Sequence, residues 1–150
     1  MAFDMSDPEL AQSIAEVIDD KNEEVEYVVF NVSTAPNKVN FQIKGKGGLN
    51  EVKAALKDEE LQFAYYRTIS GDEESKRVKF VFVSWAGEGI KKPKLRAAMS
   101  ILKGEVKDTL FKNFHIEIHA TCQDDLKEEE IAAKLKKAGG ADYSTNSGSS

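Results

Sequence analysis

The segment from Val78 to Trp85, VKFVFVSW, limits the possible folds of this chain more than any other. It is dense in β-branched and aromatic residues, which favours a β-strand. From Phe80 to Val83 both faces of that strand are apolar, and such a strand is stable only where both of its sides are covered. We therefore expect it to lie in the interior of a sheet that carries helices on both faces.

Other segments predict four more strands and four helices. Strands are expected where β-branched and aromatic residues cluster or alternate with polar ones, and helices where apolar residues recur at helical spacing. The first helix has two candidate caps, Ser6 in a capping box with Glu9, or Asp7 ahead of Pro8. The expected strands cover 27–32, 39–43, 61–69, 78–85 and 114–119, and the expected helices cover 10–18, 49–56, 93–112 and a last segment from Asp124 or Asp125 to 138.

These elements follow the order helix–strand–strand–helix–strand–strand–helix–strand–helix, without an internal repeat or a linker. Strand hairpins interrupted by helices favour a mixed sheet with helices on both faces, an α/β fold of the α+β type. The length of 150 residues suits one domain with one core. We expect the domain to cover residues 1–138 and a flexible polar tail, GGADYSTNSGSS, to cover residues 139–150.

The composition excludes several classes of protein. No run of 18 apolar residues is present, so no transmembrane segment is expected. The N-terminus lacks the basic start and the apolar block of a signal peptide. The single cysteine, Cys122, rules out an internal disulfide and fits a reducing compartment. We therefore expect a soluble protein of the cytosol.

The charge of the chain is inverted between Lys76 and Arg96. This segment carries +6, whereas the whole chain carries −5 at pH 7. Pro93 favours a helix start, so four of the cations crowd a helix N-terminus, an end that favours acids by about 0.3–1 kcal/mol per charge. Several cations at one helix N-terminus contradict this preference for acids, and such a repeated departure in one place indicates a functional site. We interpret it as a docking surface for an acidic partner. The patch is too local for nucleic-acid binding, which needs a broad basic field.

Two motifs with a possible ligand are better explained structurally. The segment GKGG at 45–48 differs from a phosphate-binding loop, because Lys46 precedes the last glycines and no hydroxyl follows. His115, Glu117 and His119 share one face of a strand, and their side chains could bind zinc. Residues of one face are about 6.6 Å apart along a strand, which is too far for one metal to reach all three easily. We expect neither a metal nor a cofactor.

Catalysis is not expected either. Cys122 has no histidine close in sequence, and Asp124 and Asp125 would raise the pKa of its thiol and lower its reactivity. Only two histidines exist, and no Ser-His-Asp or Cys-His arrangement can be argued. The chain is therefore interpreted as a binding protein and not an enzyme.

Two segments resemble one known family. The stretch SGDEESKRVKFVFVSWAGEG at 70–89 and the stretch LKKAGGADY at 135–143 resemble coactosins, which are members of the actin-depolymerising-factor homology family. The resemblance covers Leu61 to Tyr143 well, and the first sixty residues more loosely, through the order of elements. It implies a single domain with a central mixed sheet of five or six strands, helices on both faces, and binding to actin filaments.

The resemblance also suggests which residues bind actin. Lys79 matches the lysine of the family block SKRxKF, and Lys94 and Arg96 match the basic pair that opens the long helix of cofilin-like proteins. Met99 lies slightly beyond an apolar contact position. Cofilins are phosphorylated on a serine near the N-terminus, but Ser6 is expected in a capping role. With the charge pattern, the expected actin-binding residues are Lys76, Arg77, Lys79, Lys91, Lys92, Lys94, Arg96 and Met99.

The expected function is binding along actin filaments through this basic surface, with modulation of filament dynamics. We expect a monomer in the cytoplasm, at the cytoskeleton. Exposed charges mainly steer encounter, so affinity also needs apolar anchors, for which Ile90 and Met99 are candidates. Two alternatives remain open: binding or sequestration of actin monomers, and binding of anionic phosphoinositide headgroups at a membrane surface.

Overall fold

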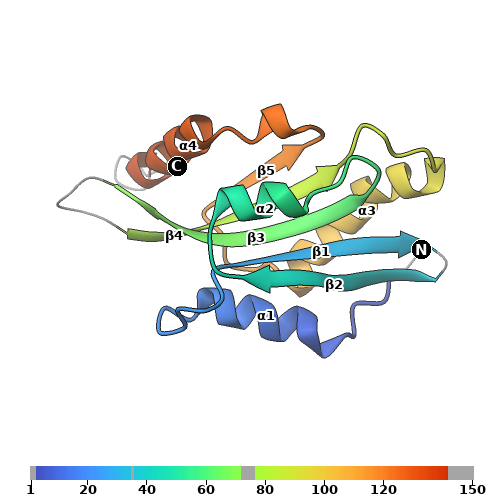
Figure 1. The fold of residues 1–150 in the computed structure, drawn as a ribbon, viewed down its shortest axis with the longest axis horizontal. Helices are drawn as coiled ribbons and strands as arrows, with labels where there is room; N and C mark the ends of the chain where they lie inside the picture. Colours follow the sequence, from blue (N-terminus) through green and yellow to red (C-terminus); the bar gives the residue numbers. More distant parts are fainter. Residues whose placement is uncertain (1–2, 35, 72–76, 142–150) are drawn as a thin grey trace.

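The computed structural model describes residues 3–34, 36–71 and 77–141. Its centre is a five-stranded sheet in the order β2-β1-β3-β4-β5 (Figure 1). Only β4 and β5 are parallel, and the other neighbours are antiparallel. The predicted mixed sheet is therefore confirmed. The strands are β1 (Tyr27–Thr34), β2 (Asn37–Gly45), β3 (Leu61–Ser70), β4 (Arg77–Ala86) and β5 (Ile116–Ala120).

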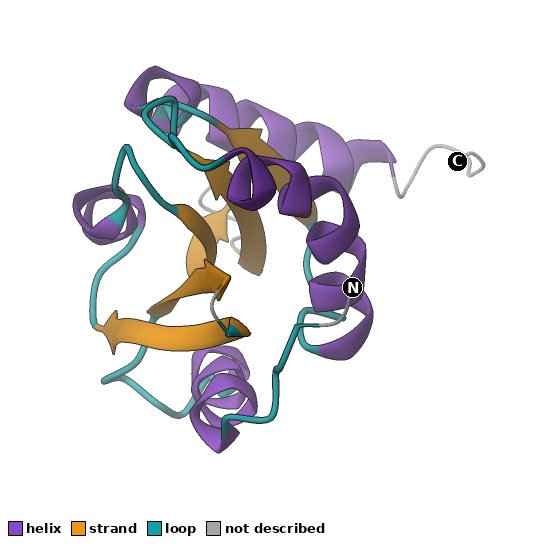
Figure 2. Cartoon of the chain, turned by 90° about the vertical axis from the view of Figure 1, so that its right-hand side faces the viewer, coloured by secondary structure: helices purple, strands orange, loops and turns teal. Residues whose placement is uncertain are grey.

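Helices cover both faces of the sheet, as predicted (Figure 2). On one face the apolar stripes of α1 and α3 pack on β1, β3 and β4. On the other face α2 and α4 pack on alternate residues of the same strands. Within the described part of the chain, no helix has both the length and the apolar character needed to cross a membrane. The helices are α1 (Pro8–Ile18), α2 (Leu49–Ala55), α3 (Pro93–Thr109) and α4 (Glu128–Ala141), with a 3₁₀ turn, η1 (Gln123–Asp125), before α4.

The central strand β4 contributes to both halves of the core. Phe82 belongs to the half beneath α1 and α3, whereas Val81 and Val83 belong to the half beneath α2 and α4. All three side chains are fully buried. This position between two layers explains why the strand has no polar face in its middle.

The β3–β4 hairpin is longer than the strand beside it. Pairing between β3 and β4 runs from Leu61 and Ala86 to Ser70 and Arg77, but β5 pairs with β4 only from Val81 to Trp85. The end of the hairpin therefore projects beyond the sheet (Figure 1). Because β4 and β5 are parallel, α3 must carry the chain back along the sheet, so α3 begins at the opposite end of β4.

The first helix begins with one of its two expected caps. The carboxylate of Asp7 accepts a hydrogen bond from the amide of Glu9 at 3.0 Å. Ser6 is exposed and donates to the carboxylate of Asp4 instead, through its amide at 2.9 Å and its hydroxyl at 2.6 Å. The expected capping role of Ser6 was therefore wrong, because Asp4 binds its hydroxyl.

The ends of the later helices also differ from expectation. Helix α3 ends at Thr109 and not near residue 112. Helix α4 begins at Glu128, because Asp125 caps the preceding turn by accepting from the amide of Thr121 at 2.9 Å. It continues through the two glycines at 139–140 to Ala141, so the propensity cost of glycine, about 1 kcal/mol, does not end it. The rest of the expected tail, 142–150, lies outside the described residues.

Candidate functional site

The cations that are close in sequence lie at opposite ends of β4. Arg77 and Lys79 form one group, the hairpin cluster, at the start of the strand. Lys91, Lys92, Lys94 and Arg96 form the second group, the helix cluster, at the start of α3. Figure 1 shows the two ends of β4 on opposite sides of the molecule. The strand is ten residues long, so its ends are about 30 Å apart. The single patch read from the sequence is therefore two patches, and Lys76 lies outside the described residues.

The hairpin cluster faces the side of the sheet that α4 covers. Lys79 lies opposite Thr68 and Arg77 opposite Ser70, and Lys79 shares its face with Val81 in the core beneath α4. Helix α4 packs on β3 and β5 at this side of the sheet, and its lysines at 134, 136 and 137 are exposed.

The opposite face of the hairpin is apolar and exposed. Ile69 and Val78 are cross-strand partners, and their exposed fractions are 66% and 41%. They lie on the same face as Phe82, beyond the last residue of β4 that β5 pairs with. They were not among the binding residues expected from the sequence, although the expected hairpin strands, 61–69 and 78–85, are longer than the expected strand 114–119.

The helix cluster surrounds an N-terminus without a side-chain cap. Pro93 starts α3, and Lys92 at the cap position makes no side-chain hydrogen bond to the helix. Lys91, Lys92 and Lys94 are exposed, and the structure gives them no ion pair within the described ranges. Among the described residues, these cations are therefore held against the helix dipole without a direct ion pair.

Arg96, unlike the three lysines, forms hydrogen bonds with the backbone before its helix. Its Nη2 atom donates to the carbonyl oxygen of Ile90 at 2.8 Å and to that of Glu88 at 3.3 Å. Arg96 is exposed, but its Nη2 atom points back to the connection before α3.

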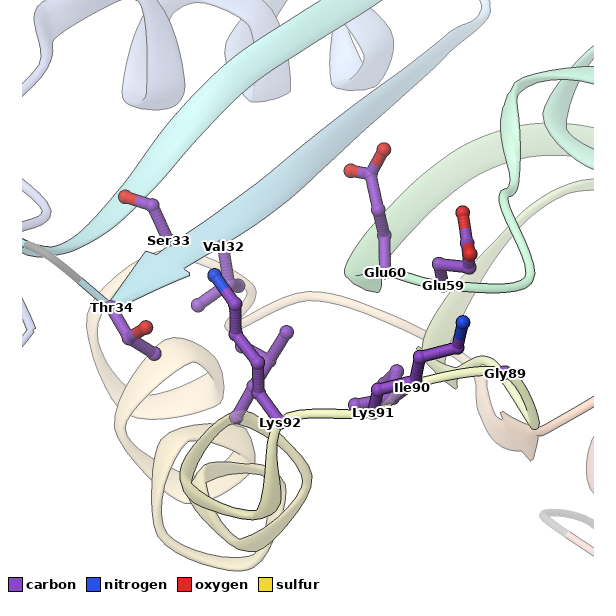
Figure 3. A pocket seen from close by; sticks show the side chains of 10 residues that line it. Val32, Ser33, Thr34, Glu59, Glu60, Gly89, Ile90, Lys91 and Lys92 are labelled. Atoms are coloured by element: carbon purple, nitrogen blue, oxygen red, sulfur yellow. The ribbon is translucent and has the colours of Figure 1, made fainter.

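A groove of about 420 Å³ opens beside the helix cluster (Figure 3). Glu59 and Glu60 line one wall, and Lys91 and Lys92 line the other. The buried side chains of Val32, Ile90 and Leu95 also line it. The two acids reduce the local positive charge here, and among the three lysines only Lys94 does not line the groove.

The two apolar anchors expected from the sequence are buried. Met99 is 7% exposed and Ile90 is 5% exposed, both within the core beneath α1 and α3. Met99 lies there because it shares one helical face with Leu95 and Leu102. In this structure neither side chain offers a contact surface, whereas Ile101 of α3 is 51% exposed.

The three polar residues of β5 and its approach have structural partners. Glu117 pairs with Lys107 at 3.0 Å and with Lys103 at 3.5 Å, and so ties β5 to α3. His119 Nδ1 and the buried Ser84 Oγ lie 2.9 Å apart in a hydrogen bond. His115 Nδ1 accepts a hydrogen bond from the amide of Phe80 at 2.9 Å. No cluster of three metal-ligating side chains occurs in the parts of the chain that the structure describes.

The structure is therefore one mixed-sheet domain with helices on both faces and groups of cations at the two ends of β4. The family model of cofilin/tropomyosin-type actin-binding proteins matches residues 2–136. The chain therefore belongs to this family of actin-binding proteins, and its relatives place it among the coactosins. The resemblance inferred from the sequence is thus confirmed.

Three relatives support this assignment. Coactosin of Entamoeba histolytica is 76% identical over 144 residues, which cover 96% of this chain and 95% of the relative. Its crystal structure matches with a TM-score of 0.88 over 93% of this chain and 98% of that one, at 72% identity. Coactosin of Dictyostelium discoideum is 42% identical, covering 95% and 96% of the two chains. The solution structure of mouse coactosin matches with a TM-score of 0.74 at 29% identity, covering 98% and 99%.

Proposed function

We propose that this protein binds along actin filaments through its two basic clusters and modulates filament dynamics without catalysis. The observation that carries the proposal is the placement of cations at both ends of β4, about 30 Å apart, where Lys79 is half-buried and the other described members of the two clusters are exposed. A partner that engages both clusters must present acidic groups over at least that distance. A filament offers such a surface continuously, from more than one subunit.

The relatives also support filament binding. Mouse coactosin is an actin filament binding protein, and this chain matches its structure over nearly its full length. The proposed location is the cytoplasm, at the cytoskeleton, and the proposed binding unit is a monomer. The contact residues proposed are the hairpin cluster and the lysines of the helix cluster, with Lys76 next to the former in sequence.

The apolar contribution is assigned to the projecting hairpin. Cations at the edge of an interface mostly affect encounter and salt dependence, so micromolar affinity, about −8 kcal/mol, also needs buried apolar area. Ile69 and Val78 offer that area beside Arg77 and Lys79. The hairpin would then present a basic face and an apolar face to the filament.

High-speed cosedimentation tests the proposal. The protein at micromolar concentration should pellet with filaments at low salt and be released as the salt concentration rises. A parallel titration with monomeric actin that is held unpolymerised separates filament binding from sequestration. Flotation with vesicles that contain a phosphoinositide tests the membrane alternative without actin. Absence from the filament pellet at low salt, with binding in either of the other assays, would refute the proposal.

A further inference from the structure

The connection between β4 and α3 is held against the segment between α2 and β3. The amide of Gly87 donates to the carbonyl of Glu60 at 3.1 Å, and the amide of Gly89 donates to that of Asp58 at 2.8 Å. The approach is so close that a Cβ atom on Gly87 would lie 2.0 Å from the carbonyl oxygen of Asp58. The first half of the connection therefore has a fixed position on the body of the domain.

The second half of the connection carries the cations and has few contacts of this kind. Ile90 closes a turn, with its amide donating to the carbonyl of Gly87 at 3.2 Å, and its side chain is buried. Lys91 and Lys92 follow, and both are exposed. Beyond Ile90, the direction of the chain into α3 depends on what holds the helix start to the turn.

Arg96 joins these two parts. It lies in the first turn of α3, where its own amide donates to the carbonyl of Lys92 at 3.1 Å. Its guanidinium reaches back to the carbonyls of Ile90 and Glu88, at 2.8 and 3.3 Å. Both bonds come from the Nη2 atom, whose two N–H groups are fixed in the plane of the guanidinium, whereas the N–H groups of a lysine ammonium rotate freely.

We propose that Arg96 is a positioning residue of the actin-binding surface, which clamps the turn at 88–90 to α3 and thereby fixes the directions of Lys91, Lys92 and Lys94. The inference rests on the proposed function, since the surface it positions is the one proposed to bind actin. It gives Arg96 a different role from Lys94, although the resemblance to cofilin-like proteins pairs the two as contacts. Arg96 acts through its neighbours, and Lys94 meets the partner.

Hydrogen–deuterium exchange on the free, full-length protein tests the clamp without actin. In Arg96→Ala the amides of Gly89 and Ile90 should exchange about tenfold faster, because hydrogen bonds to a charged group are lost from their turn. Arg96→Lys, which keeps the charge, should also exchange faster. Lys94→Ala is the matched control and should leave these amides unchanged. Amides of the buried strand β4 report whether each variant is folded.

Filament cosedimentation at several salt concentrations tests the consequence. Arg96→Ala and Arg96→Lys should both weaken binding several-fold, with the salt dependence of the wild type, because the side chain does not face the partner. Lys94→Ala should weaken binding and also reduce the salt dependence, as expected for a charge at the interface.

Each other outcome is informative. Unchanged exchange in Arg96→Ala would refute the clamp. Faster exchange with normal binding, while Lys94→Ala binds weakly, would refute the positioning role but leave the proposed function intact. Normal binding of Arg96→Lys together with weak binding of Arg96→Ala would show that Arg96 is a direct charged contact. A wild type that does not pellet with filaments would refute the proposed function and the positioning role with it, while exchange would still decide whether the clamp exists.

Discussion

Ile69 of β3 lies directly opposite Val78 of β4, and both side chains are exposed on the face of the hairpin that turns away from Lys79. The pair lies beyond the last residue of β4 that β5 pairs with. Isolated exposed aliphatic residues are common, but a cross-strand pair on a projecting hairpin beside two cations has the composition of an interface.

Replacing this pair should weaken filament binding without affecting the fold. The double variant Ile69→Thr with Val78→Thr keeps two β-branched residues in the strands but removes apolar area. Full burial of one large aliphatic side chain contributes about 1.5–3 kcal/mol, so affinity in cosedimentation should fall by about tenfold or more. Ile43→Thr on β2 is the control, since Ile43 is 40% exposed and lies on another strand. Equal losses in both variants would contradict the assignment.

Lys79→Ala should weaken filament binding and leave stability nearly unchanged. Lys79 is half-buried but has no ion pair among the described residues, so its truncation should change stability by only about 0.5 kcal/mol. The measurement is cosedimentation beside a thermal midpoint, with the exposed Lys21→Ala as the control for a generic loss of charge. If the midpoint falls together with binding, Lys79 has a structural role and the assignment is wrong.

The fold could be predicted because β4 has two apolar faces, which require cover from both sides. The division of the basic segment could not be predicted, because the sequence does not say which way the connection at 87–92 leads. Nor does periodicity show that Arg96 turns back to the carbonyls before its helix. The burial of Met99 was different, since its helical phase with Leu95 and Leu102 already placed it in the apolar stripe. Met99 was expected to contact actin because of its resemblance to a family contact position, although the helical periodicity was the more accurate guide to its burial.

Stability should fall as the pH drops from 7.5 to 5.5, in part through His119. Partial desolvation of the ring, and secondarily the positive charge of Lys103, lower the pKa of His119 below its ordinary value, although the residue is partly exposed. The unfolded chain therefore takes up a proton near pH 6.5, before the folded one does. The contribution of neutral His119 is complete above that pH and decreases as the pH falls through the interval between the two pKa values. Denaturant midpoints of the wild type and His119→Gln, measured across this range, should show a weaker pH dependence in the variant. An identical dependence would contradict this role.

Two glycines should respond to alanine in opposite directions. Gly87→Ala would place a Cβ atom 2.0 Å from the carbonyl oxygen of Asp58, a backbone atom that cannot move away cheaply, so it should be clearly destabilising. Gly104 lies within α3 with open space around it, so Gly104→Ala should stabilise by about 0.5–1 kcal/mol. Urea unfolding of both variants measures the difference. If Gly87→Ala leaves the stability unchanged, the connection at 87–92 can move away from Asp58. It then does not hold the helix cluster in place.

Lys94→Glu should raise the free energy of unfolding and abolish binding to filaments. An acid in the first turn suits the helix dipole, which is worth about 0.3–1 kcal/mol at an exposed site, and Lys94 has no described partner to lose. Against an acidic partner the same change replaces attraction by repulsion, which costs several kcal/mol.

From the dipole alone Arg96→Glu should also stabilise the protein, but the structure predicts that it destabilises the protein. That change removes the donor from the carbonyls of Ile90 and Glu88 and brings a carboxylate towards them. The measurement pairs a denaturant midpoint with cosedimentation in one buffer. Normal binding by Lys94→Glu would show that the start of α3 is not the docking surface, and a stabilised Arg96→Glu would show that its two hydrogen bonds contribute less than the dipole.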